Sequence, residues 1–235
     1  MDTTTHITEP CMPASEAIRS RRSIRAFLPN PVPQCTIEQI LETAARAPSG
    51  SNIQPWQVVV LTGSARQALS QEIEAAALSG DAGEAEYAYY PRQWREPYLA
   101  RRRTVGWALY GSLGIQRGQS DRMAAQHRRN YCFFDAPVGL FLTMDRDMEQ
   151  GSWLDLGMFA QNIMIAARGL GLDTCPQAAF CRYHRLISQR LGIPAHRQLI
   201  MAIALGYADM TAPENNFPTE REPVHEFTRF VDELP

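Results

Sequence analysis

The chain has 235 residues, of which 45% are hydrophobic and 20% charged, and its formal net charge is −2. A chain of this length and composition can bury a sizeable core, so we expect one domain over residues 1–235. The near-neutral charge gives no general attraction to nucleic acid or to an anionic membrane surface, and we expect neither as a partner.

Sequence features that would direct the chain to a membrane or a metal are not apparent. Residues Met1–Pro13 are polar, and the longest apolar run, Val138–Met144, is far too short to span a bilayer. We therefore expect a cytoplasmic protein. The histidines are scattered without the spacing of metal ligands, so we expect no metal site.

The cysteines are odd in number and include no C-x-x-C pair, which predicts reduced, mostly structural thiols. They are Cys11, Cys35, Cys132, Cys175 and Cys181. A redox role for Cys175 is an alternative, but its apolar neighbours Leu170 and Leu172 favour a packed strand residue.

Hydrophobic periodicity and turn residues predict a series of helices and strands along the chain. The predicted helices are Pro13–Arg19, Ile37–Ala45 with Thr36 as its cap, Ser64–Leu78, Gly151–Gly169 and Tyr183–Leu191. The predicted strands are Gln57–Thr62, which we expect to be buried, Val138–Met144, Leu172–Cys175 and Leu199–Leu205. Helices that bracket several strands predict an α+β fold with a mixed sheet between helical layers.

Two short segments carry most of the functional information. Arg21-Arg22-Ser23-Ile24-Arg25 offers three guanidinium groups and a hydroxyl, which suit a doubly charged phosphate held by charge-assisted hydrogen bonds. The alternative is a helix end whose cations face solvent. Ala47-Pro48-Ser49-Gly50-Ser51-Asn52-Ile53-Gln54-Pro55-Trp56 is a turn of small residues with one polar face, or simply a connector. Together the segments predict a site for a flat, polar, phosphorylated cofactor.

These segments, in this order, resemble the signature of the nitroreductase superfamily. Two further stretches fit the same pattern, Gln161–Phe180 and Pro218–Pro223. The resemblance implies a mostly antiparallel sheet flanked by helices, bound FMN and an intertwined homodimer with shared active sites. It also implies a helical excursion at about residues 80–130 and a C-terminal arm at about residues 207–235 that wraps the partner subunit.

The resemblance assigns roles to individual residues. Arg21 and Ser23 match phosphate contacts, Arg221 reaches the same phosphate, and Arg25 matches the cation beside N1 and O2 of the flavin. The partner subunit is expected to contribute Pro48, Ser49 and Asn52, and the backbone of Ala178 and Ala179 is expected near N5 and O4. The full cofactor-binding set adds Arg22, Gly50, Gln54, Pro176 and Gln177. No protein side chain is expected to be a catalytic acid or base, because the reaction takes place at the flavin.

The segment Gly80–Asn130 interleaves aromatic residues with arginines. This pattern suits a lid over a planar anion or stacking on single-stranded nucleic acid, and an ordinary helix pair with solvated arginines is the remaining alternative. The segment resembles the nitrobenzoate and nitroaniline reductases. Trp94, Tyr98 and Arg101 are therefore the candidate substrate contacts.

No G-x-G-x-x-G follows a predicted strand, so we expect no Rossmann site for a pyridine nucleotide. NADH or NADPH is then expected to stack on the flavin and leave before the acceptor enters, which gives ping-pong kinetics. The expected function is two-electron reduction of nitroaromatic or quinone acceptors by NAD(P)H. Reductive dehalogenation, ene reduction or heterocycle oxidation on the same scaffold, and a non-catalytic flavin-binding protein, are the alternatives.

Overall fold

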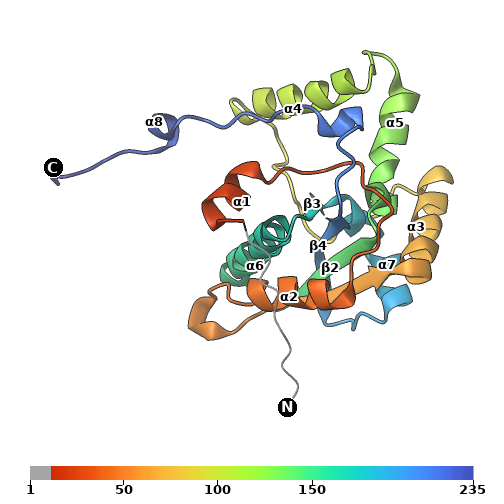
Figure 1. Ribbon diagram of the computed structural model, residues 1–235, viewed down its shortest axis with the longest axis horizontal. Helices are drawn as coiled ribbons and strands as arrows, with labels where there is room; N and C mark the ends of the chain where they lie inside the picture. The colour runs from red at the N-terminus through yellow and green to blue at the C-terminus, as the bar shows by residue number, and fades with distance from the viewer. Residues whose placement is uncertain (1–11, 235) are drawn as a thin grey trace.

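The computed structural model describes residues 12–234 (Figure 1). Its sheet has the strand order β1-β2-β4-β3, formed by β1 Gln57–Thr62, β2 Val138–Asp145, β3 Asp173–Gln177 and β4 Arg197–Gly206. Every neighbouring pair is antiparallel. The only parallel pairing within the described residues is an isolated bridge between Ser23 and Thr174. The predicted α+β fold, with a mostly antiparallel sheet flanked by helices, is confirmed.

The helices lie between and around these strands. The α-helices are α1 Ala14–Ser20, α2 Gln34–Ala44, α3 Gly63–Leu78, α4 Tyr98–Ser112, α5 Ser120–Arg128, α6 Gln150–Gly169, α7 His184–Leu191 and α8 Val224–Phe227. The 3₁₀ helices are η1 Gly50–Asn52, η2 Arg129–Asp135, η3 Ala179–Tyr183 and η4 Pro213–Asn215.

The sheet separates two hydrophobic cores, because side chains along a strand alternate between its faces. Leu140 and Leu142 of β2 contribute to the core that α2 and α6 cover, whereas Phe141 contributes to the core that α3, α7 and η2 cover. Figure 1 shows α6 and α3 on opposite sides of the strands. The protein is therefore built as a sheet between two helical layers.

Three details of the predicted elements are wrong. β1 lies at an edge of the sheet and buries only Leu61, so it is not a buried strand. Helix α2 begins at Gln34, directly after Pro33, and not at Thr36. In α6 the core-facing residues include Phe159 and Ile163. The sequence predicts a stripe of α6 through Leu154, Met158, Gln161, Ile165 and Arg168, but none of these residues is buried, and Leu154 is 72% exposed.

Residues 80–130 contain α4 and α5. The start of this segment, before α4, is hydrogen-bonded to the body of the protein. The hydroxyl of Tyr183 donates to the carbonyl of Asp81 at 2.8 Å, and the amide of Glu84 donates to the carbonyl of Arg182 at 2.7 Å. Gly83 has a φ of +62°, and a Cβ there would lie 2.4 Å from the Arg182 oxygen, so a side chain is excluded. Helix α4, in contrast, contains no buried residue.

The C-terminal part of the chain leaves the body of the protein. After β4 it passes through η4, which contacts α4, and then extends outward through α8 (Figure 1). Phe227 is 69% exposed and Phe230 is 87% exposed. Large apolar side chains in this state are typical of a surface that another protein covers.

Within residues 12–234, no helix is both long and apolar enough to cross a lipid bilayer. Cys11 and most of the polar N-terminal segment considered above lie outside the described residues.

Candidate functional site

The segment Arg21–Arg25, called here the arginine segment, lies along the free edge of β3. The amide of Ile24 donates to the carbonyl of Thr174 at 3.0 Å, and Ser23 forms the bridge to the same residue. Ile24 is buried at 2% exposure and anchors the segment in the core. The polar neighbours of Ile24 are thereby directed to a common cavity.

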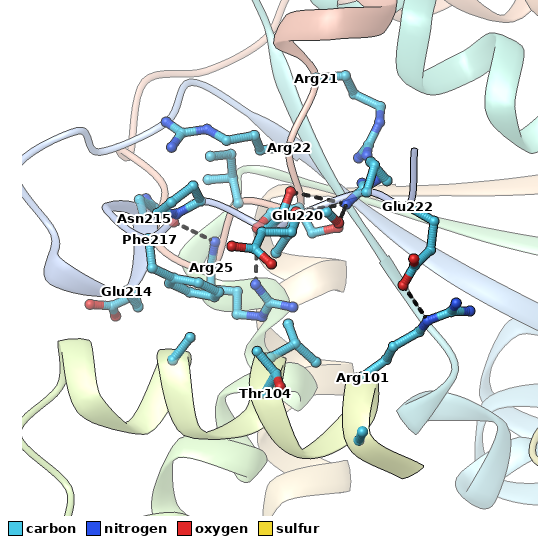
Figure 2. Close-up of a pocket in the computed structure, with 18 of the residues that line it drawn as sticks. Arg21, Arg22, Arg25, Arg101, Thr104, Glu214, Asn215, Phe217, Glu220 and Glu222 are labelled. Atoms are coloured by element: carbon cyan, nitrogen blue, oxygen red, sulfur yellow. Dashed lines mark hydrogen bonds and ion pairs between the residues drawn. The ribbon is translucent and has the colours of Figure 1, made fainter. Parts of the chain in front are cut away.

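This cavity, called the arginine cavity, has a volume of about 1270 Å³. The arginine segment forms one wall, α4 forms a second, and residues 214–223 of the C-terminal part close a third (Figure 2). The α4 residues that face it include Arg101, Thr104, Val105 and Ala108. They recur at the i, i+3, i+4 and i+7 positions of one helix face. A cavity of this size accommodates a large planar cofactor together with a small substrate.

The lining of the arginine cavity is positively charged. It contains five arginines (Arg21, Arg22, Arg25, Arg101 and Arg221) and three glutamates (Glu214, Glu220 and Glu222), so its formal net charge is +2. Among residues 12–234, every one of these arginines except Arg101 lacks a carboxylate within ion-pair distance. Guanidinium groups that converge without a carboxylate partner favour an anion of complementary charge.

The pKa of Arg21 shows how closely these cations are brought together. Burial lowers the pKa of its guanidinium from the ordinary value, and the neighbouring charge of Arg221 lowers it further. A bound phosphate dianion would relieve both effects, since it supplies opposite charge and hydrogen-bond acceptors. The residues present therefore fit the phosphate of FMN.

Arg25 is held more firmly than its neighbours. Its amide donates to Asn215 Oδ1 at 2.7 Å, and its Nη1 donates to the carbonyl of Ser23 at 3.1 Å. The guanidinium carbon lies 5.8 Å from the ring centre of Phe217, in cation–π range. The charge of Arg25 consequently has a defined position at the cavity.

Arg221 is oriented by its own segment. Its Nη1 donates to Thr219 Oγ1 at 3.0 Å and to the carbonyl of Glu220 at 2.8 Å. Thr219 occupies a position where some proteins of the resembled superfamily carry a lysine. Here the threonine hydroxyl accepts a hydrogen bond from Arg221, so it positions a cation although it carries no charge.

The turn that follows α2 lies at a second cavity. Pro48 lines this cavity together with α6 residues that include Trp153, Leu154 and Met158. The turn holds itself in shape, since Gln54 N donates to Ser49 Oγ at 3.0 Å and the Gln54 side chain donates to the carbonyl of Asn52 at 3.1 Å. Gly50 N donates to Asp155 of α6 at 3.2 Å. None of the turn residues lines the arginine cavity of the same chain.

The other predicted cofactor residues follow the arginine segment across the sheet edge. Pro176 and Gln177 end β3, and Ala178 and Ala179 follow it. Gln177 is buried, and its amide donates to the carbonyl of Asn130 at 2.9 Å. These residues do not line the arginine cavity. They lie on the strand that carries Thr174, the partner of Ser23.

Only one of the predicted substrate contacts faces the arginine cavity. Arg101 lines it, and its Nε donates to Glu222 at 2.9 Å. Trp94 instead packs under the guanidinium of Arg102, 4.7 Å away, and Tyr98 stacks with Arg95 at 5.2 Å. In this chain Trp94 and Tyr98 therefore belong to an aromatic and arginine surface beside the cavity.

The two cysteines nearest to this region are buried and hold their protons. Cys175 lies in β3, and burial raises the pKa of its thiol to about 11. Burial also raises the pKa of Cys181 to about 11. A packed strand thiol, and not a reactive thiolate, accounts for Cys175.

Part of the lining was not predicted from the sequence. Thr104, Val105 and Ala108 had a usable signal, because they share helical spacing with Arg101, which was predicted. Asn215 and Phe217 precede the predicted segment Pro218–Pro223 directly. No pattern marked them, since their role depends on contacts with residues nearly two hundred positions away.

Comparison with known proteins identifies the family. Residues 18–207 match the Nitroreductase family. The chain belongs to this family. It is 40% identical over 227 residues to the 4-nitrobenzoate reductase of Nocardioides sp. (strain LMS-CY), covering 94% of this chain and 92% of that protein. The nitrobenzene nitroreductase of Ectopseudomonas oleovorans is 39% identical over 219 residues, covering 93% of this chain and 96% of that protein.

Solved structures agree with this membership. The FMN and NADPH-dependent nitroreductase NfnB from sphigopyxis sp. strain HMH superposes with a TM-score of 0.91 at 39% identity, covering 94% of this chain and 100% of that one. NfnB from Mycobacterium smegmatis, solved in complex with NADPH, gives a TM-score of 0.88 at 34% identity, covering 93% of this chain and 97% of that one. The predicted family is confirmed.

Proposed function

We propose that this protein is an FMN-dependent oxidoreductase that uses NADPH or NADH to reduce nitroaromatic compounds. The relatives described above are a 4-nitrobenzoate reductase, a nitrobenzene nitroreductase and two NfnB nitroreductases. The predicted cofactor and reaction class are those of these relatives. The observation that carries the proposal is the arginine cavity, whose net charge of +2 matches a phosphate dianion.

The arginine segment and the C-terminal residues hold the phosphate. Arg21, Arg22 and Ser23 approach from one wall and Arg221 from another. Because Arg21 is partly buried, its hydrogen bonds to a phosphate are shielded from solvent and are stronger than those of a surface arginine. A riboflavin without phosphate would leave these guanidinium groups unpaired.

FMN, when bound, supplies the chemistry by accepting a hydride from the pyridine nucleotide and passing two electrons to the nitro compound. The protein orients the flavin and stabilises its reduced form. Arg25 would lie beside N1 and O2 of the flavin, as the family resemblance implies, and its guanidinium would stabilise the negative charge that the reduced ring collects there. We expect the nucleotide and the acceptor to use one pocket in turn, which would give the ping-pong order.

Two chains complete each site in this proposal. None of the turn residues Pro48, Ser49, Gly50, Asn52 and Gln54 lines the arginine cavity of their own chain, and Pro48 lines a separate one. The outward stripe of α6, the exposed Phe227 and Phe230, and the free edge of β1 are apolar or hydrogen-bonding surfaces that a second copy would cover. A symmetric partner would bring its turn to the flavin, near Pro176, Gln177, Ala178 and Ala179 of this chain.

Arg101 can bind a substrate carboxylate, so the proposed substrate class is an acid of the 4-nitrobenzoate type. Of the predicted substrate contacts, only Arg101 lines the cavity, and its partner Glu222 is partly exposed. An exposed ion pair of this kind is worth about 0–1 kcal/mol, so a substrate carboxylate can exchange with Glu222. Trp94 and Tyr98 then act at the rim. A cytoplasmic location stays a prediction of the sequence.

The test is a comparison of cofactors and acceptors on the purified protein. The protein is expected to bind FMN far more tightly than riboflavin and to oxidise NADPH or NADH rapidly only when a nitroaromatic acceptor is added. Equal binding of the two flavins would contradict the phosphate site. Flavin that is reduced slowly, without acceptor turnover, would instead identify a flavin-binding protein without catalytic activity.

A further inference from the structure

Arg25 is held by two side chains that come from distant parts of the chain. Asn215 Oδ1 accepts from the amide of Arg25 at 2.7 Å across 190 residues of sequence. Arg129 Nη2 donates to the carbonyl of Arg25 at 3.4 Å across 104 residues. Both backbone polar groups of one residue are therefore satisfied by side chains, although a strand or a helix ordinarily provides such partners.

Asn215 makes three hydrogen bonds with its side-chain amide, using its acceptor oxygen and both of its donors. Besides accepting from Arg25, its Nδ2 donates to the carbonyl of Ala26 at 2.9 Å and to the carbonyl of Asp209 at 2.8 Å. The residue is only 4% exposed. Since a buried polar group that loses its partner destabilises the folded protein, this arrangement disfavours any other position of the backbone at Arg25 and Ala26.

The neighbouring residue Glu214 supports the second contact. It is buried at 5% exposure, and its Oε1 lies 3.5 Å from Arg129 Nη1. Arg129 also pairs with Asp135 at 3.0 Å. The two carboxylates hold the guanidinium of Arg129 from different sides, so that one Nη atom is directed to the carbonyl of Arg25. Two consecutive residues of η4 thus act on the backbone of Arg25: Asn215 binds its amide directly, and Glu214 pairs with Arg129, which donates to its carbonyl.

We propose that Asn215, assisted by Glu214 and Arg129, is a positioning residue that sets the place of the Arg25 guanidinium and thereby the reduction potential of bound FMN. The inference rests on the proposed function, in which Arg25 stabilises the negative charge of the reduced ring. A charge that is fixed before the reaction stabilises more than one that must reorient. Holding the backbone of Arg25 limits the region that its side chain can reach.

The experiment measures the midpoint potential of FMN bound to saturated protein, together with the FMN dissociation constant and thermal unfolding. Arg25→Ala is expected to lower the equilibrium constant for two-electron reduction by about tenfold, which is a shift of about 30 mV to more negative potential. Asn215→Leu removes all three hydrogen bonds without changing charge, and its potential is expected to shift in the same direction.

The decisive comparison is the double variant. If Asn215 acts through Arg25, the potential of Arg25→Ala with Asn215→Leu equals that of Arg25→Ala alone. The matched control is Asn216→Ala, because Asn216 is the next residue and also donates to two carbonyls, those of Met210 and Ala212, but does not contact Arg25. Its potential is expected to stay at the wild-type value.

Different failures have different meanings. A wild-type potential in Asn215→Leu, or additive shifts in the double variant, would overturn the positioning role while leaving the proposed function intact. No shift in Arg25→Ala would overturn the tuning role of Arg25 and with it the positioning role of Asn215, whereas no FMN binding by the wild type would overturn the proposed function itself. If Asn215→Leu does not fold, Asn215→Ser and the charge-conserving Arg129→Lys take its place and are expected to shift the potential by less.

Discussion

Two walls of the same cavity differ in how they are held. The arginine segment is fixed by main-chain hydrogen bonds to Thr174 and Asn215 and by the buried side chain of Ile24. Helix α4 has no buried residue, and it is linked to the C-terminal wall by the half-exposed ion pair of Arg101 and Glu222. The fixed wall suits a cofactor that stays bound, whereas the loosely held wall suits acceptors of varied shape.

The largest expected effect is on FMN binding, and it follows from removing a cation of the arginine segment, which forms the fixed wall. Arg21→Ala should weaken FMN binding by about 10- to 150-fold, the equivalent of the roughly 1.5–3 kcal/mol of a hydrogen bond to a charged group. Fluorescence titration of the apo-protein with FMN measures the dissociation constant. Arg19→Ala is the control, because Arg19 is an exposed residue of α1 that does not line the cavity.

The second prediction tests whether the arginine segment of one chain and the turn at Asn52 of another chain form one active site. Arg21→Ala and Asn52→Ala proteins should each be inactive, and their mixture under subunit exchange should recover part of the activity. The reason is that a mixed dimer contains one site with both residues intact. Exchange is followed with differently tagged subunits, and proven exchange without recovery would mean that both residues serve the same chain's site.

The third prediction concerns the loosely held wall. Arg101→Ala should raise the KM for 4-nitrobenzoate by about one to two orders of magnitude, as expected for loss of a charge-assisted hydrogen bond, while barely changing the KM for nitrobenzene. Arg103→Ala is the matched control, since Arg103 is on α4 but does not line the cavity. Equal responses to the acid and the neutral compound would show that Arg101 belongs to a solvated surface.

The smallest expected effect concerns the two buried thiols, Cys175 and Cys181. At pH 8, iodoacetamide should modify the exposed Cys35 readily and leave Cys175 and Cys181 unmodified in the native protein. The pKa of each buried thiol is raised to about 11 from an ordinary value of 9.0. The folded state holds the thiol protons more tightly than the unfolded state does. The resulting contribution to the free energy of unfolding is complete below pH 9 and is lost as the pH rises through about 11. Mass spectrometry and denaturant unfolding at pH 8 and pH 10 measure both effects.

The sequence predicted well what depends on local pattern. Strands such as Val138–Met144 and the helix Gly151–Gly169 follow from periodicity, and the arginine segment was recognisable from residue type alone. The sequence did not reveal that β1 lies at a sheet edge, because composition reports apolarity and not the number of neighbouring strands. The outward orientation of Leu154 was likewise invisible, since apolar residues on α6 serve both the core and an outer surface.

The candidate site was predicted in part. Arg21, Arg22, Arg25 and Arg221 were selected from motifs, and the structure places all of them at one cavity. Trp94 and Tyr98 were selected from composition and lie beside it, because their neighbours Arg102 and Arg95 hold them by stacking. Asn215 could not be found, since its importance arises from three hydrogen bonds that exist only after folding.

The position of the arginine segment along β3 also makes the two edges of the sheet unequal. At one edge of the sheet, the bridge from Ser23 to Thr174 occupies backbone groups that another strand would otherwise pair with. At the opposite edge, β1 has no outer strand among the described residues. The edge at β1 is therefore the more open of the two to pairing with another strand.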